Sequence, residues 1–463
     1  MKRQRLLWLV VVLGLVAAAC GRSGSDTQPE EPGGGGGTSA TTNSACNGVT
    51  LEATDTGVTA DTITIQVMAD TGSPLAPGLF QGNIDALKGF EKHINDNGGL
   101  GCRKLKVETW DSKLTPEEGK NGQINACQTA LAMVGDNALF NPDVSEMDTC
   151  ADGKGTPTGI PNVTALANDI NEQCAVNTYS ISASPDTCPA GGGLPSGVRP
   201  FTIAVGQVPF AQTITPDLVG FYMVPGDLPT TVQSATWAIA AQAEAGVDWA
   251  ETTKVSGRDE QAAYTPRIQA AASSGVNYVY NGSNDAAMMS MRREAAAQGF
   301  KPAVWMCSIS CYTAKFKAAT DMDGTYFVMP FLPFEDKGSN QELDNYLDSI
   351  STPDSFGAMA WQAAVLFQQA VDDVVTSKGP NGITRANLLE ALSGITSFDA
   401  NGWIGPKNPK GGPNGVSPCI ARMQMQGGAF VRTEPDQKGK LDCNPDYLVT
   451  VNIDPAVEAA KIQ

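Results

Sequence analysis

The chain has very little histidine, and His93 is its only one in 463 residues. Nucleophilic catalysis by serine or cysteine usually needs a histidine base, and no G-x-S-x-G turn is present to hold a nucleophilic serine. His93 stands among charged neighbours on an expected helix, which is typical of a solvated surface residue. These absences argue against an enzyme of the Ser-His or Cys-His type. A hydrolase that uses paired carboxylates stays open as an alternative.

Positive charge is also scarce. Lysine and arginine number 31 against 49 aspartates and glutamates, which gives a formal net charge of −18. Nucleic-acid binding needs a basic surface, so this balance argues against a nucleic-acid partner and against adhesion to anionic lipid. No glycine-rich phosphate loop follows the first expected strand, so we expect no nucleotide and no other cofactor.

Long apolar runs are missing except near the start, where Leu6–Val16 is too short to span a bilayer comfortably. This run follows a basic stretch and precedes Ala17-Ala18-Ala19-Cys20, an order typical of a signal peptide. The segment resembles the lipobox of bacterial lipoproteins, with Ala17 where leucine is commoner. The resemblance implies cleavage before Cys20, lipidation of that cysteine, and attachment to the extracytoplasmic face of the cell membrane through the lipid alone. An ordinary secretory signal is the alternative.

The next segment, residues 21–45, is rich in glycine, serine, threonine and proline and has no apolar cluster. This composition is typical of a flexible tether. We therefore expect a signal peptide over residues 1–19, and a lipid anchor and flexible tether over residues 20–57, before the folded part begins.

The stretch Thr62–Asp111 has the pattern of a complete strand–loop–helix–strand unit. Ile63, Ile65 and Val67 are spaced two apart, as in a strand, and the turn residues Asp70–Pro74 follow. Apolar residues between positions 84 and 94 then recur every three or four residues, as on one helix face. A right-handed crossover makes the two strands parallel, and ligands bind at the carboxyl ends of such strands. The loops at 70–78 and 110–114 are therefore expected to face the ligand.

A second run of strand–helix units begins with the apolar strand at 218–224. Two successive sets of this kind predict an α/β protein with parallel sheets in two lobes. In the first set, we expect the second helix to run to about Val134 and the third strand to lie at Ala138–Phe140.

Ten cysteines remain after Cys20, an even number that predicts disulfides in an exported protein. A zinc site at the closely spaced Cys307 and Cys311 is the alternative. It lacks both a second close cysteine pair and a second histidine, so we expect no metal. Proximity favours Cys102–Cys127, Cys174–Cys188, Cys307–Cys311 and Cys419–Cys443, which leaves Cys46 and Cys150 as possible partners.

Several phrases in a fixed order resemble one known family. They are Thr71–Pro74, Ile94–Gly99, Arg103–Leu105, Tyr264–Ala271 and Asp354–Trp361. Together they resemble the substrate-binding proteins of ABC importers with the type I periplasmic-binding fold, in particular the leucine/isoleucine/valine-binding-protein-like group. The resemblance covers residues 58–443.

The resemblance implies two Rossmann-like lobes with parallel sheets, joined by three crossover strands, with the ligand cleft between them. We place lobe 1 at residues 58–206 plus 335–400, lobe 2 at 207–334 plus 401–445, and a C-terminal tail at 446–463. It further implies a monomeric receptor, not an enzyme, that captures a small polar solute such as an amino acid or amide and delivers it to ABC permease subunits. A ligand sensor that signals to a membrane partner from the same cleft is the alternative.

In such a receptor, strand-end loops and helix N-termini hold the solute. The family's amino-acid binders pair the ligand ammonium with a carboxylate in the second lobe. The matching position falls near Ile309 or Ser310, so that carboxylate is missing here, and Asp169 or Asp227 is the candidate replacement. The full set of expected ligand-binding residues is Thr71, Ser73, Asn141, Asn168, Asp169, Asp227, Ser283, Asn284, Tyr312 and Phe334.

Overall fold

The structure is a computed structural model that describes residues 45–73, 77–182, 188–189, 193–412 and 414–463. The expected signal peptide, Cys20 and residues 21–44 of the expected tether lie outside the described residues. In the part that is described, none of the helices has the length and hydropathy of a membrane span.

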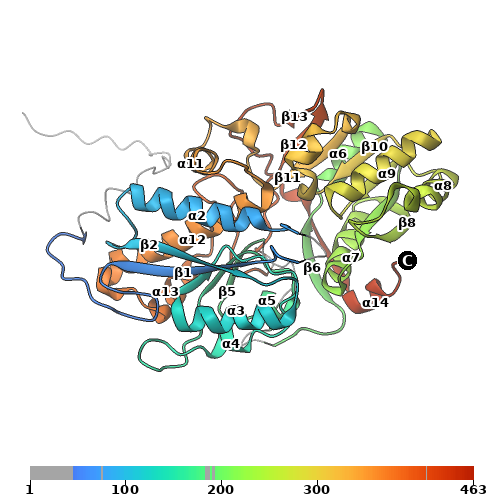
Figure 1. The fold of residues 1–463 in the computed structure, drawn as a ribbon. Coiled ribbons are helices and arrows are strands. Elements are labelled where there is room, and N and C mark those ends of the chain that lie inside the picture. The colour runs from blue at the N-terminus through green and yellow to red at the C-terminus, as the bar shows by residue number, and fades with distance from the viewer. Residues whose placement is uncertain (1–44, 74–76, 183–187, 190–192, 413) are drawn as a thin grey trace, which may run out of the picture. The chain divides into compact units, whose positions relative to one another are not determined.

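The first half of the chain builds a five-stranded parallel sheet in the order β2-β1-β3-β4-β5. Side chains of β1 alternate between its two faces, as the sequence pattern predicts: Ile63, Ile65 and Val67 join one core cluster, whereas Met68 joins another. Figure 1 shows helices α2 and α3 on opposite sides of this sheet. The strands are β1 (Thr62–Ala69), β2 (Lys104–Asp111), β3 (Ala132–Val134), β4 (Asn162–Leu166) and β5 (Thr178–Ser182).

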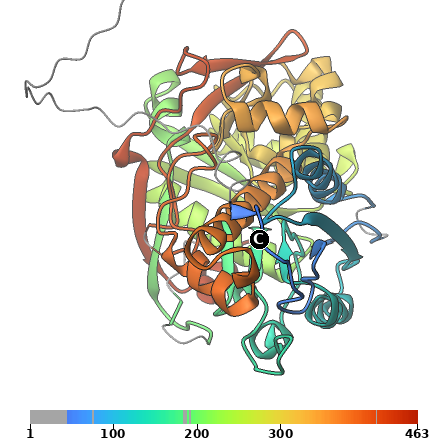
Figure 2. The same cartoon turned by 90° about the vertical axis from the view of Figure 1, so that its left-hand side faces the viewer.

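Helices from two distant parts of the chain cover this sheet. The long helix α12, whose apolar side chains are buried, packs against α2, β4 and β5, and α11 also packs against α2 (Figure 2). We call this sheet and its helices lobe 1. The helices are α2 (Gln81–Asp96), α3 (Pro116–Thr129), α4 (Ser145–Thr149), α5 (Ile170–Gln173), α11 (Gln341–Ser349), α12 (Ser355–Lys378) and α13 (Arg385–Gly394).

The second half builds a seven-stranded sheet in the order β13-β12-β11-β10-β9-β7-β8, in which β12 and β13 run antiparallel to their neighbours. We call this sheet and its helices lobe 2. Its strands are β7 (Leu218–Pro225), β8 (Val247–Val255), β9 (Tyr278–Asn281), β10 (Val304–Cys307), β11 (Thr325–Met329), β12 (Ala421–Gln426) and β13 (Ala429–Glu434). Its helices are α6 (Gln207–Ile214), α7 (Pro229–Glu244), α8 (Thr265–Ser273), α9 (Asp285–Gln298) and α10 (Ala314–Ala318), with short 3₁₀ turns η1 (Gln261–Tyr264), η2 (Ile309–Cys311) and η3 (Thr320–Met322).

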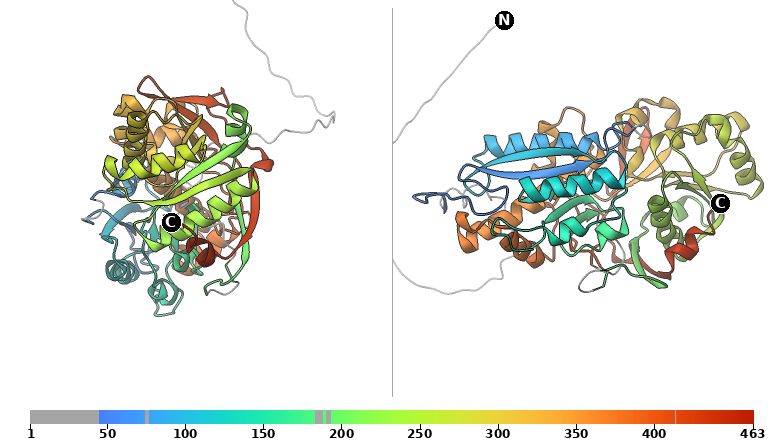
Figure 3. Two further views of the ribbon diagram at one scale, coloured as in Figure 1. Left: turned by 90° about the vertical axis from the view of Figure 1, so that its right-hand side faces the viewer. Right: turned by 60° about the horizontal axis from the view of Figure 1, so that its bottom comes forward.

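The chain passes between the sheets three times, as expected. After β5 it enters lobe 2 through β6 (Arg199–Ala204), and it returns to α11 through Phe331 and the turn η4 (Phe334–Asp336). After α13 it crosses again, and there Ile404 pairs with Phe331 in an antiparallel bridge. Residues 446–463, expected as a tail, instead contain β14 (Leu448–Ile453), which pairs with β6, and α14 (Pro455–Ala459), which lies against α7 (Figure 3).

Helix ends follow the residues that the sequence offers for them. Thr115 caps α3 by accepting a hydrogen bond from Glu118 N at 3.3 Å, and Asn284 caps α9 through Ala287 N at 3.0 Å. Gly299 ends α9 with a φ of 74°, a left-handed conformation that glycine adopts without strain.

Two expectations about the first set of elements are wrong. The helix that we extended to Val134 ends at Thr129, and the third strand lies at Ala132–Val134 rather than at Ala138–Phe140. The strand is buried on both faces, so its side chains show no alternation that would separate it from the end of the preceding helix.

The expected bridge between Cys102 and Cys127 is also wrong. Cys102 pairs with Cys46 and Cys127 pairs with Cys150, while the three other expected pairs are present. The reason is that Cys102 precedes β2 whereas Cys127 lies near the end of α3, so the two sit at different places in lobe 1. The disulfide between Cys307 and Cys311 also removes both thiols from the zinc alternative.

Segment 46–58 is fixed along lobe 1 at the amino ends of β1 and β2. The buried Arg103 side chain donates to Glu52 O at 3.0 Å and to Thr59 O at 2.7 Å, and Asn381 Nδ2 donates to Thr50 O at 2.9 Å. The Cys46–Cys102 bridge closes the same contact covalently. This segment therefore belongs to the folded part rather than to a tether.

A second buried arginine, Arg385, binds the end of α3 in lobe 1. Arg385 donates to the carbonyl oxygens of Ala130 at 2.6 Å, Ala151 at 2.6 Å and Cys127 at 2.8 Å. These are carbonyls at the end of α3 and after the Cys127–Cys150 bridge, which lack helical partners. Burial lowers the pKa of Arg385.

Candidate solute-binding site

Asp70 joins three loops at the carboxyl end of the lobe 1 sheet. It follows β1 directly and is fully buried. Its Oδ1 accepts hydrogen bonds from Ser112 Oγ at 2.7 Å and from Leu114 N at 2.8 Å, and its Oδ2 accepts one from Leu139 N at 2.8 Å. Burial raises the pKa of Asp70, and these hydrogen bonds oppose that shift. The Asp70 carboxylate therefore fixes the positions of the loops after β1, β2 and β3 relative to each other.

Asp111, at the end of β2, organises the loop that contains Thr71. Its Oδ1 accepts hydrogen bonds from the backbone N–H groups of Thr71, Gly72 and Lys113, each at 3.0 Å. A Cβ on Gly72 would lie 2.1 Å from Asp111 Oδ2, so the close approach requires glycine there. Burial raises the pKa of Asp111, but these hydrogen bonds together outweigh it, so the pKa lies below its ordinary value. Thr71 stays partly exposed at this edge, and Ser73 is buried.

The other expected residues of lobe 1 lie in the loops after β3 and β4. Asn141 is buried, and its Oδ1 accepts a hydrogen bond from Gln123 Nε2 at 2.7 Å. Asn168 is half-buried, and Asp169 caps the short helix α5 by accepting a hydrogen bond from Asn171 N at 2.9 Å. The Asp169 carboxylate thus has a local structural partner.

Glu172, which the sequence analysis missed, lies beneath these loops and is fully buried. Its Oε1 accepts a hydrogen bond from Asn162 Nδ2 at 3.0 Å. Burial raises the pKa of Glu172 to about 8, against the effect of that hydrogen bond, and the neighbouring Asp169 adds to the rise. Glu172 is therefore mainly protonated at neutral pH. No sequence signal marks it, because Glu in a short polar helix is normally solvated.

In lobe 2, two expected residues have structural roles. The exposed Asp227 accepts hydrogen bonds from Ser256 Oγ at 2.7 Å and Gly257 N at 3.2 Å, and lies 3.6 Å from Arg258 Nη2. Asn284 caps α9, and a Cβ on Gly257 would lie 1.9 Å from Asn284 Nδ2. The loop after β8 therefore lies against both the loop after β7 and the start of α9.

The loop after β10 is held by the Cys307–Cys311 bridge. Asn281 Nδ2, at the end of β9, lies 3.2 Å from Cys307 Sγ and 3.5 Å from Cys311 Sγ, both within the distance of a weak hydrogen bond. Ser283 N donates to Asn281 Oδ1 at 3.0 Å. Asn281 thus connects the loops after β9 and β10, and Ser283 is buried beside them.

Tyr312 and Phe334 come together where lobe 2 meets the second crossover. The Tyr312 hydroxyl donates to the Glu335 carboxylate and accepts a hydrogen bond from Phe334 N at 2.9 Å. The two rings have centroids 4.9 Å apart. Burial raises the pKa of Tyr312 well above its ordinary value, and the adjacent Glu335 adds to this. Tyr312 is therefore fixed as a neutral hydroxyl.

Two hydrogen bonds connect the strand-end loops of one lobe to a helix N-terminus of the other. Thr230 Oγ1, on the first turn of α7, donates to Leu139 O at 3.2 Å. Ser355 Oγ, at the start of α12, donates to Ile309 O at 3.1 Å. The carboxyl ends of the two parallel sheets thus approach each other, which is where open α/β sheets bind ligands.

Residues 62–429 match the family model described as periplasmic binding protein. The chain belongs to this family. Its members are extracytoplasmic solute-binding proteins rather than enzymes. A search of curated protein sequences found no match.

Solved structures of this family share the fold at low identity. The fatty acid ABC transporter substrate-binding protein from Thermomonospora curvata is 16% identical over 90% of this chain and 97% of its own, with a TM-score of 0.58. The leucine binding protein LivK from Thermotoga maritima is 13% identical over 83% and 99%, with a TM-score of 0.60. A solute binding protein from R. palustris in complex with benzoate is 15% identical over 83% and 98%, with a TM-score of 0.57.

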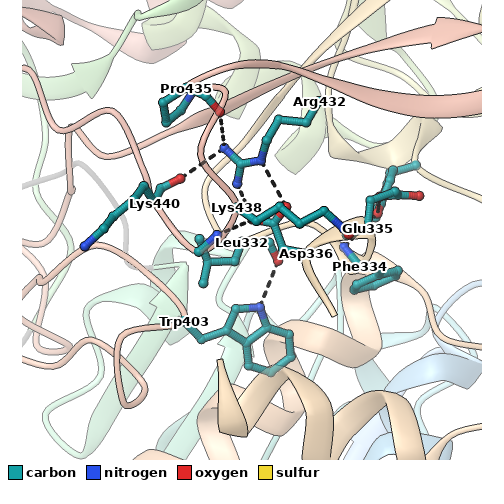
Figure 4. Close-up of polar contacts among 11 residues, drawn as sticks. Leu332, Phe334, Glu335, Asp336, Trp403, Arg432, Pro435, Lys438 and Lys440 are labelled. Carbon is teal, nitrogen blue, oxygen red and sulfur yellow. Dashed lines mark hydrogen bonds and ion pairs between the residues drawn. The ribbon is translucent and has the colours of Figure 1, made fainter. Parts of the chain in front are cut away.

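In this periplasmic binding protein, a buried ion pair fixes the second crossover (Figure 4). Arg432 of β13 donates from Nε to Asp336 Oδ1 at 3.0 Å and forms a second bond from Nη2 to Oδ2. Both side chains are buried, with exposed fractions of 7% and 0%. Gly439 N also donates to Asp336 Oδ2 at 3.0 Å.

The third crossover is bound to the second in the same region. Trp403 Nε1 donates to Leu332 O at 3.0 Å, and Leu332 N donates to Trp403 O at 2.9 Å (Figure 4). Arg432 Nη1 also donates to the carbonyl oxygens of Pro435 and Lys440 at 2.9 and 3.0 Å. Two crossovers and the end of β13 thus form one connected unit.

Glu172 predicts a pH dependence of stability. Between its ordinary pKa of 4.5 and about 8, the folded chain keeps a proton that the unfolded chain has lost. The free energy of unfolding should therefore fall as the pH rises through this window and level off above it. Glu172→Gln should reduce that slope, measured by chemical denaturation across the window. Glu244→Gln, at an exposed position, is the control, and an unchanged slope in Glu172→Gln would contradict the assignment.

The Asp336–Arg432 pair predicts strong coupling between two substitutions. Asp336→Ala should lower the free energy of unfolding by roughly 3–5 kcal/mol, because it leaves Arg432 buried without its partner. The double variant Asp336→Ala/Arg432→Met should lose clearly less than the sum of the two single losses, measured by denaturant titration. Lys337→Ala is the control, because its ion pair with Asp348 is exposed and should contribute less than about 1 kcal/mol. Additive losses would contradict the coupling.

Proposed function

We propose that this protein captures a small polar solute, such as an amino acid, an amide or a similar compound, and delivers it to an ABC permease. The observation that supports this most is the approach of the two sets of strand-end loops across Thr230–Leu139 and Ser355–Ile309, in a chain of the periplasmic binding protein family. Two lobes linked by three crossovers suit closure around a solute by a hinge motion.

The named solutes of structural relatives differ from one another. Three proteins with this fold are named for a fatty acid, for leucine and for a complex with benzoate. The fold therefore serves several solute chemistries, and the loops of this chain must decide its own. We expect the ten residues put forward from the sequence to divide into loop-forming residues, such as Asp169 and Asn284, and solute contacts, such as Thr71.

We further propose that Cys20 carries the lipid and holds the receptor on the extracytoplasmic face of the membrane, as a monomer. The basic start, the apolar run Leu6–Val16 and the small residues before Cys20 support this. A lipid-anchored receptor stays near the permease that it serves, because acyl chains bind the bilayer stably.

Solute capture predicts a co-purified or titratable ligand. Mass spectrometry of small molecules released from the full chain should show one solute at near-stoichiometric amount, and isothermal titration with that solute should be saturable. Ser355→Ala should weaken binding by a few-fold, because it removes a hydrogen bond made only when the lobes approach. Ser377→Ala, on the far end of α12, is the control. No released solute, together with no titratable binding to amino acids, amides, carboxylic acids or short peptides, would sink the proposal.

Lipid anchoring predicts that growth with labelled palmitate labels the protein and that Cys20→Ser abolishes this label. The wild-type chain should fractionate with membranes and the variant with the soluble fraction. Cys46→Ser is the control cysteine, since Cys46 forms a disulfide with Cys102. A labelled Cys20→Ser variant would contradict the proposed site.

A further inference from the structure

Apolar residues flank the first contact between the lobes. Leu139, whose carbonyl accepts the hydrogen bond from Thr230, is half-buried, and so is the next residue, Phe140. On the opposite side, Leu228 directly precedes α7 and is also half-buried. On the lobe 1 side the polar contact uses a backbone carbonyl, and the half-buried side chains of Leu139 and Phe140 lie beside it.

The second contact has the same character. Ile309, whose carbonyl accepts the hydrogen bond from Ser355, is half-buried. Phe356, the residue after Ser355, is half-buried and packs edge-to-face on Phe80 with ring centroids 4.9 Å apart. Phe334, on the nearby crossover, is half-buried against Tyr312. Both places where the lobes meet therefore present apolar surface from both sides.

Carboxylates near these loops are already bound by their own surroundings. An amino acid in such a site needs a carboxylate for its ammonium group, because a buried charge without a partner is costly. Asp169 and Asp227, the two candidates from the sequence, cap α5 and hold the loop after β8. Among the other described carboxylates that likewise accept hydrogen bonds within their own lobe or crossover are Asp70, Asp111, Asp285, Glu335 and Asp354.

We infer that the site takes a small acyl or aryl solute that carries no ammonium group, in preference to a free amino acid. This inference rests on the proposed function and narrows its solute class. The apolar body lies between the half-buried side chains Leu139, Phe140 and Phe356. Each buried CH₂ group then strengthens binding by roughly fourfold. An added ammonium group meets these apolar side chains, while the described carboxylates named above already bind groups of this chain, so affinity is lost.

Two matched pairs of solutes test this directly. Leucine differs from 4-methylpentanoate, and phenylalanine from 3-phenylpropionate, only in the ammonium group. Isothermal titration of the full chain, freed of endogenous solute by partial unfolding and refolding, should show the deaminated member of at least one pair binding tenfold or more tightly, in line with the cost of an unpaired polar group. The corresponding carboxamides show whether a negative charge contributes.

Variants connect the preference to the named side chains. Phe140→Ser and Phe356→Ser should each lower the affinity for the deaminated acid by roughly tenfold, since each removes apolar contact. Val198→Ser, at a side chain that is 72% exposed, is the control, and circular dichroism checks that each variant folds. Unchanged affinity in both folded phenylalanine variants would overturn the placement.

The outcomes separate this inference from the proposed function. Tighter binding of leucine or phenylalanine than of the deaminated acids would overturn the inference and leave the receptor function intact. The release of a polyhydroxylated solute from the purified protein would do the same. Absence of binding to every compound, with no solute released, would overturn both.

Discussion

A buried carboxylate must be paired, and in this protein that constraint organises the candidate site. Asp70 has no access to water, so its oxygens bind Ser112 and Leu114 in the loop after β2 and Leu139 in the loop after β3. Without these hydrogen bonds, the strand ends alone would not fix the conformations of the two loops. The inter-lobe bond from Thr230 then reaches the carbonyl of Leu139, the same residue whose N–H Asp70 holds. The Asp70 side chain of lobe 1 thus positions the residue that α7 of lobe 2 contacts.

At the second crossover the buried group that needs a partner is a cation. Arg432 is buried in lobe 2 and needs an anion, which Asp336 of the second crossover supplies. The crossover is consequently attached to lobe 2 as far as Asp336, and two residues later the Gly338 N–H donates to Asp344 Oδ1 of α11 in lobe 1 at 2.7 Å. On this segment the chain thus changes from contacts with lobe 2 to contacts with lobe 1 between Asp336 and Gly338.

Much of this architecture was predictable from the sequence, and the exceptions have physical causes. The alternation of Ile63, Ile65 and Val67 and the caps Thr115 and Asn284 are local signals, and local structure follows them. The strand Ala132–Val134 has no such signal because both of its faces are buried. Cys102 pairs with Cys46 because the Arg103 side chain holds segment 46–58 beside β2. That contact joins residues far apart in the chain, so the sequence gives no local signal for it. In the site, aspartate and asparagine cap helices as readily as they bind solutes, and Asp169 and Asn284 are caps. The raised pKa of Glu172 follows from its burial, which the sequence does not show.

The disulfide between Cys46 and Cys102 also decides how mechanical load enters the molecule. With the lipid on Cys20, as we propose, a pull from the membrane side would be taken up by a covalent bond just before β2, together with the contacts of Arg103 and Asn381. These lie at the amino ends of the strands, whereas the solute loops lie at the carboxyl ends. A load at this end would therefore reach the sheet a strand length away from the strand-end loops.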